Sequence, residues 1–307
     1  MQSLSGKVIS TLLCAIFHSP LINNSELSNK AGKKTKKYRS HYKPAKEFDY
    51  SICELNGVNH EILEAKRKGN DKVVLLLHGG SYKVRLIDMY RRLSEKISRT
   101  LDYCTVYDLD YRTFPEYKYP AQIEDTVALF QKMLRKGIKA EDIVIIGDSA
   151  GANLALASTL YMRDNGMKLP AAVICFSLWG DATNSGKSIV ENCYRDPFGG
   201  IARRKKPEEN WEYLHRISAF AKDLDRNSPY VSPSFADFTG FPPVTLICGE
   251  AEMDRSANEL AYENMRKVGV DVELHMFDGM FHDFQLISFF PETKRSFGIM
   301  KDRIKQL

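Results

Sequence analysis

A serine near the middle of the chain stands in a pattern that can supply a nucleophile. The stretch VIIGDSAGANLALA runs from a short apolar segment through Gly147, Ser149 and Gly151 into a segment of helical composition. In a strand–turn–helix context, small residues on both sides of a serine permit a sharp turn that presents its hydroxyl at the end of the sheet. The pattern therefore predicts Ser149 as a nucleophile. The competing interpretation is a small-residue helix start without chemistry.

Backbone amides that can stabilise an oxyanion are expected beside this serine. The stretch VVLLLHGGSY ends an apolar strand, and its Gly79 permits a bend that lets Gly80 and Ser81 present their N–H groups. The N–H of Ala150, directly after the serine, points to the same place. Preorganised donors of this kind contribute about 3–4 kcal/mol each to a transition state. His78 is expected to bind the backbone of this loop and to take no part in the chemistry.

A histidine that can act as general base follows the last expected strand. His282 lies in FDGMFHDFQ, where a triad with the chain order serine, acid, histidine has its third member. Its imidazole would take the proton of Ser149 and return it to the leaving group. The remaining histidines lie within a strand or away from the expected strand ends: His18, His41, His60, His215 and His275.

The elements that would position these residues alternate between strand and helix. After a hairpin signal at Asn56-Gly57, the expected strands are Val73–Leu77, Cys104–Leu109, Ile143–Ile146, Ala172–Ser177, Val244–Cys248 and Val272–Phe277. The expected helices are Ile87–Leu101, Ala121–Lys136, Ser149–Asn165, Asn258–Val268 and Glu292–Gln306. This alternation predicts an α/β fold whose mostly parallel sheet is flanked by helices on both faces. The strandless stretch of about sixty residues before Gly240 is too long for a connection and predicts a lid over the strand ends.

The first residues carry an apolar helical pattern, and a basic run follows it. Apolar residues at helical spacing predict an amphipathic helix that covers another part of the fold: Val8, Ile9, Leu12, Leu13, Ile16 and Phe17. This stretch is too short to span a bilayer, and no cleavage site follows it. The run Asn29–Lys43 carries seven Lys or Arg and no acid. It predicts a solvated connector or a site for an anionic substrate or membrane surface, and no nucleic-acid-binding module accompanies it.

The composition limits the class of the protein. The chain has 307 residues, of which 43% are hydrophobic, enough for one large α/β domain with a substantial core. The six cysteines form no C-x-x-C pair and no metal-like cluster. They predict buried free thiols in a reducing compartment, and hence a cytoplasmic protein without a bound metal.

Together these motifs resemble the hormone-sensitive-lipase-like branch of the α/β-hydrolases, the esterases with an HGG oxyanion motif and a GDSAG nucleophile motif. The segments YRTFPEYKYPAQIEDT, RDPFGG, SPYVSPSFADFTGFPPV and GMFH are also similar to that family. The resemblance is good over roughly Val73–Phe284 and loose over about the first 50 residues. It implies an α/β-hydrolase core, a helical cap and hydrolysis of a small-molecule carboxylic ester without metal or organic cofactor.

The resemblance divides the chain into two parts. Residues 1–46 are expected to form N-terminal cap helices and a basic linker, and residues 47–307 an α/β-hydrolase domain with a cap insertion at about residues 181–240. Tyr82, Trp179, Phe17 and Phe281 could line the pocket, although each is equally consistent with core packing. The sequence leaves open a homo-oligomer and a membrane-surface contact through the N-terminal helix.

The same resemblance selects the triad acid from a run of carboxylates. In the family, the acid follows a glycine at a strand end by three positions and precedes the histidine by about thirty. Three positions after Gly249 stands Glu252, and 282 − 252 = 30, so both counts select Glu252. Asp254 misses both counts by two, and Glu250 is a third alternative. An S-x-x-E pattern from Ser256 predicts a helix start there, with the negative charge of Asp254 just before it.

The sequence departs from the family pattern at three positions. Ser81 replaces a third glycine of the oxyanion motif, and Ala152 stands where many relatives have a glycine. The Ser81 backbone still offers an N–H. Asp283 replaces the glycine that usually follows the histidine, and its carboxylate either perturbs His282 or faces solvent.

The sequence therefore predicts a serine carboxylesterase. Ser149 would attack an ester carbonyl, His282 would act as the base, Glu252 would orient the imidazole, and water would hydrolyse the acyl-enzyme. A cap over a partly apolar pocket predicts short- to medium-chain acyl groups. The alternatives are an amidase, formamidase or other acyl hydrolase with the same triad, and a non-catalytic binding protein on the α/β-hydrolase fold.

Overall fold

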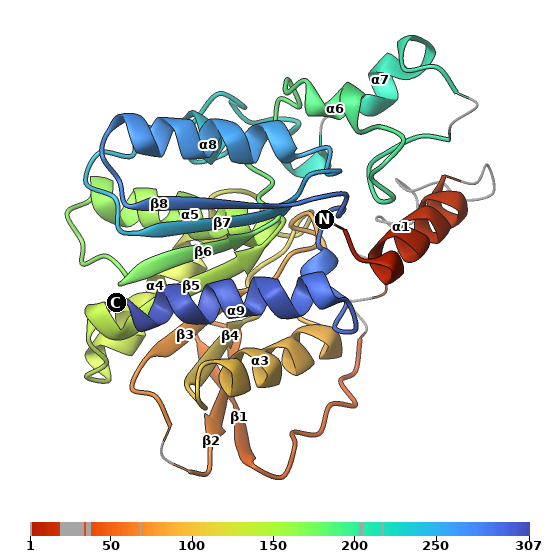
Figure 1. The fold of residues 1–307 in the computed structure, drawn as a ribbon. Coiled ribbons are helices and arrows are strands. Elements are labelled where there is room, and N and C mark those ends of the chain that lie inside the picture. Colours follow the sequence, from red (N-terminus) through yellow and green to blue (C-terminus); the bar gives the residue numbers. More distant parts are fainter. Residues whose placement is uncertain (1, 19–33, 35–37, 68, 203–204, 216–217) are drawn as a thin grey trace.

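An eight-stranded sheet lies at the centre of the computed structural model, which describes residues 2–18, 34, 38–67, 69–202, 205–215 and 218–307 (Figure 1). The strand order is β1-β2-β4-β3-β5-β6-β7-β8. Strands β3 to β8 are parallel, whereas β2 is antiparallel to both of its neighbours. The strands are β1 (Phe48–Leu55), β2 (Val58–Ala65), β3 (Val73–Leu77), β4 (Thr105–Leu109), β5 (Ile143–Asp148), β6 (Ala172–Phe176), β7 (Val244–Gly249) and β8 (Val272–Phe277).

Helices cover both faces of this sheet (Figure 1). One face packs against α3 and α9, and the other packs against α4, α5 and α8. The α-helices are α1 (Leu4–Phe17), α3 (Asp88–Thr100), α4 (Ala121–Arg135), α5 (Ala150–Asp164), α6 (Ser188–Glu191), α7 (Trp211–Leu214), α8 (Arg255–Lys267) and α9 (Pro291–Lys305). Short 3-10 helices are η1 (Ala140–Asp142), η2 (Glu208–Asn210), η3 (Ala219–Ala221), η4 (Pro233–Phe235) and η5 (Phe284–Leu286).

The central strands are mostly apolar because both of their faces are buried. In β5, Val144 and Ile146 face the core with α3 and α9, while Ile145 faces the core with α4, α5 and α8. Every residue of β3 is buried as well. Runs such as VVLLL are therefore strands without a solvent face, as expected for a parallel sheet under two helical layers. The predicted α/β fold class is confirmed.

The sequence signals for individual elements hold in most places. Asn56 and Gly57, with φ of 53° and 78°, form the two-residue turn of the β1–β2 hairpin, whose register pairs Leu55 with Val58. The bounds of β3 and β8 agree with the prediction, and β5 runs two residues further, to Asp148.

The predicted start of α8 near Ser256 holds to within one residue, but the predicted capping box is wrong. The helix begins at Arg255, so Ser256 lies inside it and does not cap it. The hydroxyl of Ser256 instead accepts the N–H of Ser188, and the Ser256 N–H donates to the Ser188 hydroxyl. Glu259 pairs with Arg255 at 3.4 Å. A distant segment competes for the serine that a local capping box would need.

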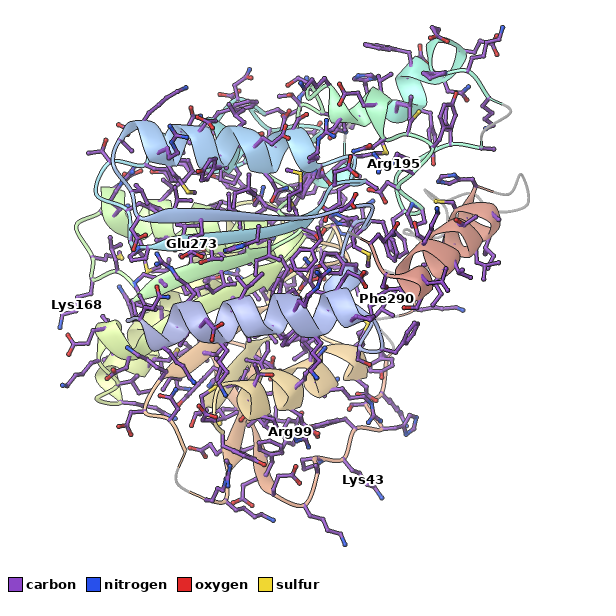
Figure 2. The ribbon with its side chains drawn as sticks, in the orientation of Figure 1. Lys43, Arg99, Lys168, Arg195, Glu273 and Phe290 are labelled. Atoms are coloured by element: carbon purple, nitrogen blue, oxygen red, sulfur yellow. The ribbon has the colours of Figure 1, made fainter. Side chains whose placement is uncertain are left out.

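The described residues between β6 and β7 form short helices and turns without a strand, and the stretch with α6 and α7 lies with α1 at the carboxyl ends of the strands (Figure 1). Two side chains connect this segment to the loop after β7. Asn192 donates to the backbone oxygens of Glu250 and Glu252, at 2.9 and 2.7 Å. Arg195, labelled in Figure 2, forms an ion pair with the carboxylate of Glu250. The division at residues 46 and 181–240 stays a prediction.

Helix α1 covers the fold with a narrower face than its sequence pattern predicts. Ile9 and Leu13 pack against the core and Phe17 packs on Phe198, but Val8, Leu12 and Ile16 are exposed. The exposed fractions are 80% for Leu4, 49% for Val8, 55% for Leu12 and 52% for Ile16. None of the helices in the described ranges is long and apolar enough to cross a membrane.

The N-terminus of α1 is held beside the start of α9. Ser3 caps the helix by accepting the N–H of Gly6 at 3.0 Å. Its hydroxyl and backbone N–H also donate to the Glu292 carboxylate, at 2.9 and 2.5 Å. Figure 2 shows Phe290 at this start of α9, on the side of α1.

Candidate active site

Ser149 lies on a strained turn between β5 and α5. Its φ of 51° and ψ of −117° are outside the ordinary regions for a residue with a side chain. A Cβ on Gly147 would collide with the carbonyl of Gly151, and a Cβ on Gly151 would collide with that of Leu77. The two glycines therefore let the turn pack against α5 and β3, and the predicted strand–turn–helix context is present.

The side chains of Ser149, His282 and Glu252 meet at the carboxyl end of the sheet. His282 Nε2 lies 2.9 Å from Ser149 Oγ, and His282 Nδ1 lies 3.4 Å from Glu252 Oε2. Glu252 is fully buried, and its Oε1 accepts the Gly249 N–H at 2.5 Å and the Ser177 hydroxyl at 2.7 Å. The structure thus brings together the three residues that the sequence selected.

A second carboxylate approaches the same ring nitrogen. Asp254 Oδ2 lies 3.6 Å from His282 Nδ1, and no other described residue binds this carboxylate. Burial raises the pKa of Asp254 to about 7, with the charge of His282 opposing that rise. Because Asp254 is partly protonated near neutrality and Glu252 is held by two donors, the surroundings favour Glu252 as the residue that orients the ring.

The electrostatics of His282 are set by carboxylates. Burial by itself would lower the pKa of this imidazole, but the negative charges of Asp283, Glu252 and Asp254 outweigh burial and raise it well above its ordinary value. These charges stabilise the imidazolium that forms when the ring takes a proton from Ser149.

The glycine loop after β3 has one occupied and two available N–H groups. The Gly79 N–H contacts the carboxylate of Asp148 and the hydroxyl of Tyr90, both at 3.0 Å, so it does not point to a substrate. Gly79 therefore contributes to the oxyanion loop by permitting its bend, and its N–H is not a donor to the oxyanion. Within the described ranges, the N–H groups of Gly80 and Ser81 have no acceptor, and neither has that of Ala150.

Several positioning residues were not foreseen from the sequence. Tyr90 and Asp148 fix the glycine loop, with the tyrosine hydroxyl donating to the Asp148 carboxylate at 2.8 Å. Ser177 connects the acid to the histidine loop, because its oxygen also accepts the N–H of Asp283 at 3.0 Å. Asp148 and Ser177 are the polar residues that directly end the apolar runs of β5 and β6. This position is the signal that could have identified them.

Asp196, in the RDPFGG segment, supports the acid loop from the insertion. Its carboxylate accepts the Met253 N–H at 2.9 Å and the Phe198 N–H at 3.1 Å. Its backbone oxygen lies 2.9 Å from His18 Nε2, at the end of α1. Asp196 therefore joins α1, the insertion and the residue that follows Glu252.

The expected role of His78 is confirmed, and two of the expected wall residues belong to the core. His78 Nδ1 contacts the Gly79 oxygen at 2.9 Å, and its ring stacks on Tyr111. Tyr82 is buried and donates to Asn153 at 2.8 Å, and Phe281 is fully buried. Trp179 is partly buried against the core, and Phe17 packs on Phe198.

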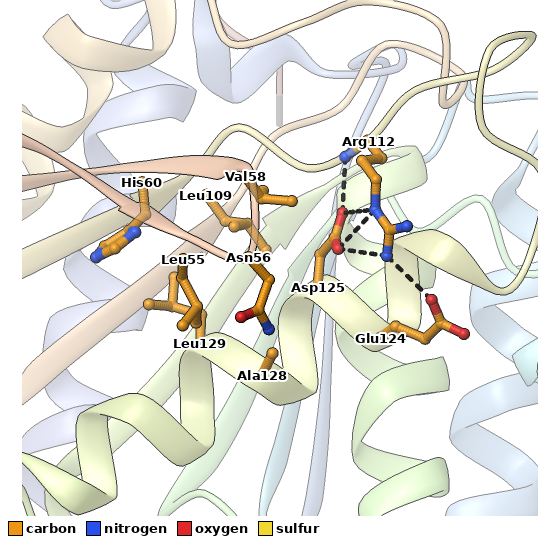
Figure 3. Close-up of a pocket in the computed structure, with 10 residues that line it drawn as sticks. All are labelled: Leu55, Asn56, Val58, His60, Leu109, Arg112, Glu124, Asp125, Ala128 and Leu129. Carbon is orange, nitrogen blue, oxygen red and sulfur yellow. Dashed lines mark hydrogen bonds and ion pairs between the residues drawn. The ribbon is translucent and has the colours of Figure 1, made fainter.

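A cavity of about 210 Å³ lies away from this site, beneath the β1–β2 hairpin (Figure 3). It is lined by residues of the hairpin, β4 and α4, and Arg112 closes one side through its ion pairs with Asp125 and Glu124. None of the triad residues lines this cavity, so it is not the place where Ser149 would meet a substrate.

In the described part of the chain, no group of three or more His, Cys, Asp or Glu side chains could hold a metal ion.

Comparison with known proteins assigns the family. A family model described as the alpha/beta hydrolase fold matches residues 74–286. The chain belongs to this family. A structure of an esterase from the bacterial hormone-sensitive lipase family is similar to it with a TM-score of 0.81 and 26% identity, covering 100% of this chain and 99% of the other. The expected hormone-sensitive-lipase-like branch is confirmed.

Curated relatives carry names of the same class. The chain is 30% identical over 244 residues to an esterase of Acinetobacter venetianus, covering 79% of this chain and 77% of the relative. It is 31% identical over 211 residues to an acetyl-hydrolase of Streptomyces hygroscopicus, covering 69% and 67%. The expectation of a carboxylic ester hydrolase is confirmed.

Proposed function

We propose that this protein hydrolyses short- to medium-chain acyl esters through a Ser149–His282–Glu252 triad and an acyl-enzyme. The observation that carries the proposal is the 2.9 Å contact between Ser149 Oγ and His282 Nε2 on a strained turn. Such a contact lets a general base activate an otherwise weak nucleophile.

In the acylation step, Ser149 Oγ forms a bond to the ester carbonyl carbon while its proton moves to His282 Nε2. The carbonyl oxygen becomes an oxyanion, which the N–H groups of Gly80, Ser81 and Ala150 can reach from the turn and the glycine loop. The imidazolium then gives its proton to the alcohol oxygen, and the carbon–oxygen bond breaks. Glu252, held by neutral donors, keeps Nδ1 oriented throughout.

Deacylation repeats these roles with water as the nucleophile. His282 removes a proton from the water, the water oxygen attacks the acyl carbon, and Ser149 leaves as an alcohol. No organic cofactor or metal enters any step of this scheme.

A small acyl group is supported by two observations. Relatives of the chain are named acetyl-hydrolase or acetyl esterase. Aromatic side chains from α1, the insertion and the histidine loop also contact one another, with Phe198 between Phe17 and Phe281. We infer that these contacts limit the space available to the acyl group.

The test is hydrolysis of p-nitrophenyl esters of increasing acyl length, from acetate to longer chains. Turnover should be highest for the shorter chains, and Ser149→Ala should reduce kcat by about 10⁵-fold or more. Absence of turnover above the Ser149→Ala background on every ester and amide would reject an enzyme and favour a binding protein. Turnover of p-nitroanilides or formamides that exceeds turnover of matched esters would favour an amidase.

A surface-bound form of the same esterase is favoured by the exposed stripe on α1. Leu4, Val8, Leu12 and Ile16 are spaced four residues apart, and each is about half exposed or more. The charge of the chain is unevenly divided. Residues 1–43 carry eight Lys or Arg and one acid, a net +7, whereas the rest carries 36 and 38, a net −2. An apolar stripe that is followed in the sequence by excess positive charge is a composition that suits the surface of an anionic bilayer.

Co-sedimentation of the full chain with vesicles tests this form. Binding should require an anionic lipid such as phosphatidylserine, and Leu12→Ser should weaken it. The matched control is Ile52→Ser, because Ile52 is 60% exposed and lies on the edge strand β1, away from α1 (Figure 1). Failure to bind anionic vesicles would reject membrane binding. It would also be rejected if analytical ultracentrifugation showed a dimer that Leu12→Ser disrupts.

A cytoplasmic location, which the six free cysteines support, belongs to the same proposal.

A further inference from the structure

The residue after the histidine is an acid whose carboxylate faces the nucleophile side of the ring. Asp283 Oδ2 lies 3.4 Å from His282 Nε2, the same nitrogen that lies 2.9 Å from Ser149 Oγ. Glu252 and Asp254 approach the opposite nitrogen, Nδ1. Asp283 therefore shares with Ser149 the one lone pair on which proton transfer depends.

The backbone fixes Asp283 in this place. Its φ of 57° and ψ of 28° are left-handed, a conformation that asparagine, aspartate and glycine adopt most readily. Its N–H donates to the Ser177 hydroxyl oxygen, so the residue is tied to the group that also holds Glu252. Its Oδ1 is buried without a hydrogen-bond partner in the described structure.

The charges around Asp283 are mostly of its own sign. Asp148 approaches from the end of β5, Glu252 from the loop after β7, and Asp196 from the insertion. Among the described residues, His282 is the cationic partner within ion-pair distance. Burial and these acids raise the pKa of Asp283, while His282 opposes the rise. The two side chains therefore hold one proton between them over a range of pH.

We infer that Asp283 competes with Ser149 for His282 Nε2 and so raises the pH at which the enzyme becomes active. The inference rests on the proposed triad. If the shared proton is on the ring, Nε2 has no lone pair; if it is on the carboxyl group, that group donates to Nε2. In either state the proton must pass to solvent before the Ser149 proton can move to Nε2. Removal of the carboxylate leaves this nitrogen free at lower pH.

Two substitutions test the inference without forcing the backbone. Asp283→Asn keeps the shape of the side chain, and Asp283→Gly removes it, and both residues tolerate a left-handed φ. The acid limb of kcat/KM, followed from about pH 5 to about pH 10, should move to lower pH by about one to three units in both variants. The control is Glu141→Gln, which removes one negative charge from an exposed side chain on η1. It should leave the limb in place.

A second measurement makes the test independent of ester chemistry. The rate at which a fluorophosphonate inactivates Ser149 depends on the same free nitrogen, so its pH profile should move with that of kcat/KM. The inference would be overturned if the acid limb of kcat/KM stayed at the wild-type pH in both variants while their melting temperatures matched the wild type. Loss of activity at every pH in both folded variants would overturn it too. A wild-type enzyme that hydrolyses no ester would instead reject the proposed function.

Discussion

The sheet end and the segments that cover it are built differently. At the sheet end, Asp148, Ser177 and Glu252 are almost fully buried, and each forms side-chain hydrogen bonds with two or more groups. At the strand ends, α1 and the stretch from α6 to α7 expose large apolar side chains, among them Trp211 at 56% and Phe198 at 40%. The contrast indicates that the reacting groups are fixed by the sheet, whereas α1 and the stretch from α6 to α7 leave apolar side chains in contact with solvent.

The first prediction concerns the acid at the sheet end. Glu252→Gln should lower kcat on p-nitrophenyl butyrate by about 10³- to 10⁴-fold, because the neutral amide no longer stabilises the imidazolium. Asp254→Asn should lower it by less than about tenfold, since Asp254 is partly protonated already. Steady-state kinetics of the two variants decide the matter. The reverse ranking would make Asp254 the triad acid.

A smaller effect is expected one contact away. Ser177→Ala removes a hydrogen bond to a charged carboxylate and should lower kcat by about tenfold, with KM nearly unchanged. Ser158→Ala is the matched control, because the Ser158 hydroxyl is buried in α5 without a partner in the described structure. Equal kinetics for the two variants would remove Ser177 from the positioning network.

Stability should respond to pH through Asp254. Its folded pKa of about 7 lies above its ordinary value of 3.8, so this group contributes stability below about pH 3.8 that is lost as the pH rises through 7. Asp254→Asn should therefore raise Tm near pH 8 by roughly 2–6 °C. Thermal unfolding at about pH 4 should show almost no difference. A lower Tm for the variant at pH 8 would contradict this assignment.

The smallest effect is expected in the cover. Ser3→Ala removes the α1 cap and one contact to Glu292, at a cost of about 1 kcal/mol. Hydrogen exchange should become faster in α1 alone, while kcat on the acetate ester stays the same. Ser10→Ala is the control, because Ser10 lies within α1 and its hydroxyl does not contact the Ser3 cap. A comparable loss of kcat would show that the cover is part of the catalytic arrangement.

The sequence was sufficient where a local pattern and its burial agree. The bounds of β3 and β8, the hairpin at Asn56-Gly57 and the turn at Ser149 follow from short runs that long-range contacts then support. Local patterns were not sufficient to select the triad acid. Its selection used the spacing seen in the family, in which both the distance from Gly249 and the distance to His282 point to Glu252.

The remaining features depend on residues that are far apart in the chain. The capping box expected at the start of α8 is absent because Ser188, 68 positions away, binds its serine. The exposed face of α1 was missed because the spacing of its apolar residues defines a broad apolar face. It does not show which part of that face contacts the core. Ser177 and Asp196 were missed because their partners lie on other loops.

The contacts between the insertion and the acid loop have a consequence for divergence within the family. Asn192 and Asp196 hold the backbone of the residues around Glu252, and they belong to the same segment that lies over the strand ends. Replacement of this segment to accommodate a bulkier ester would also remove supports of the acid. A change in this segment is therefore expected to alter the position of Glu252 as well, unless the loop after β7 carries compensating substitutions.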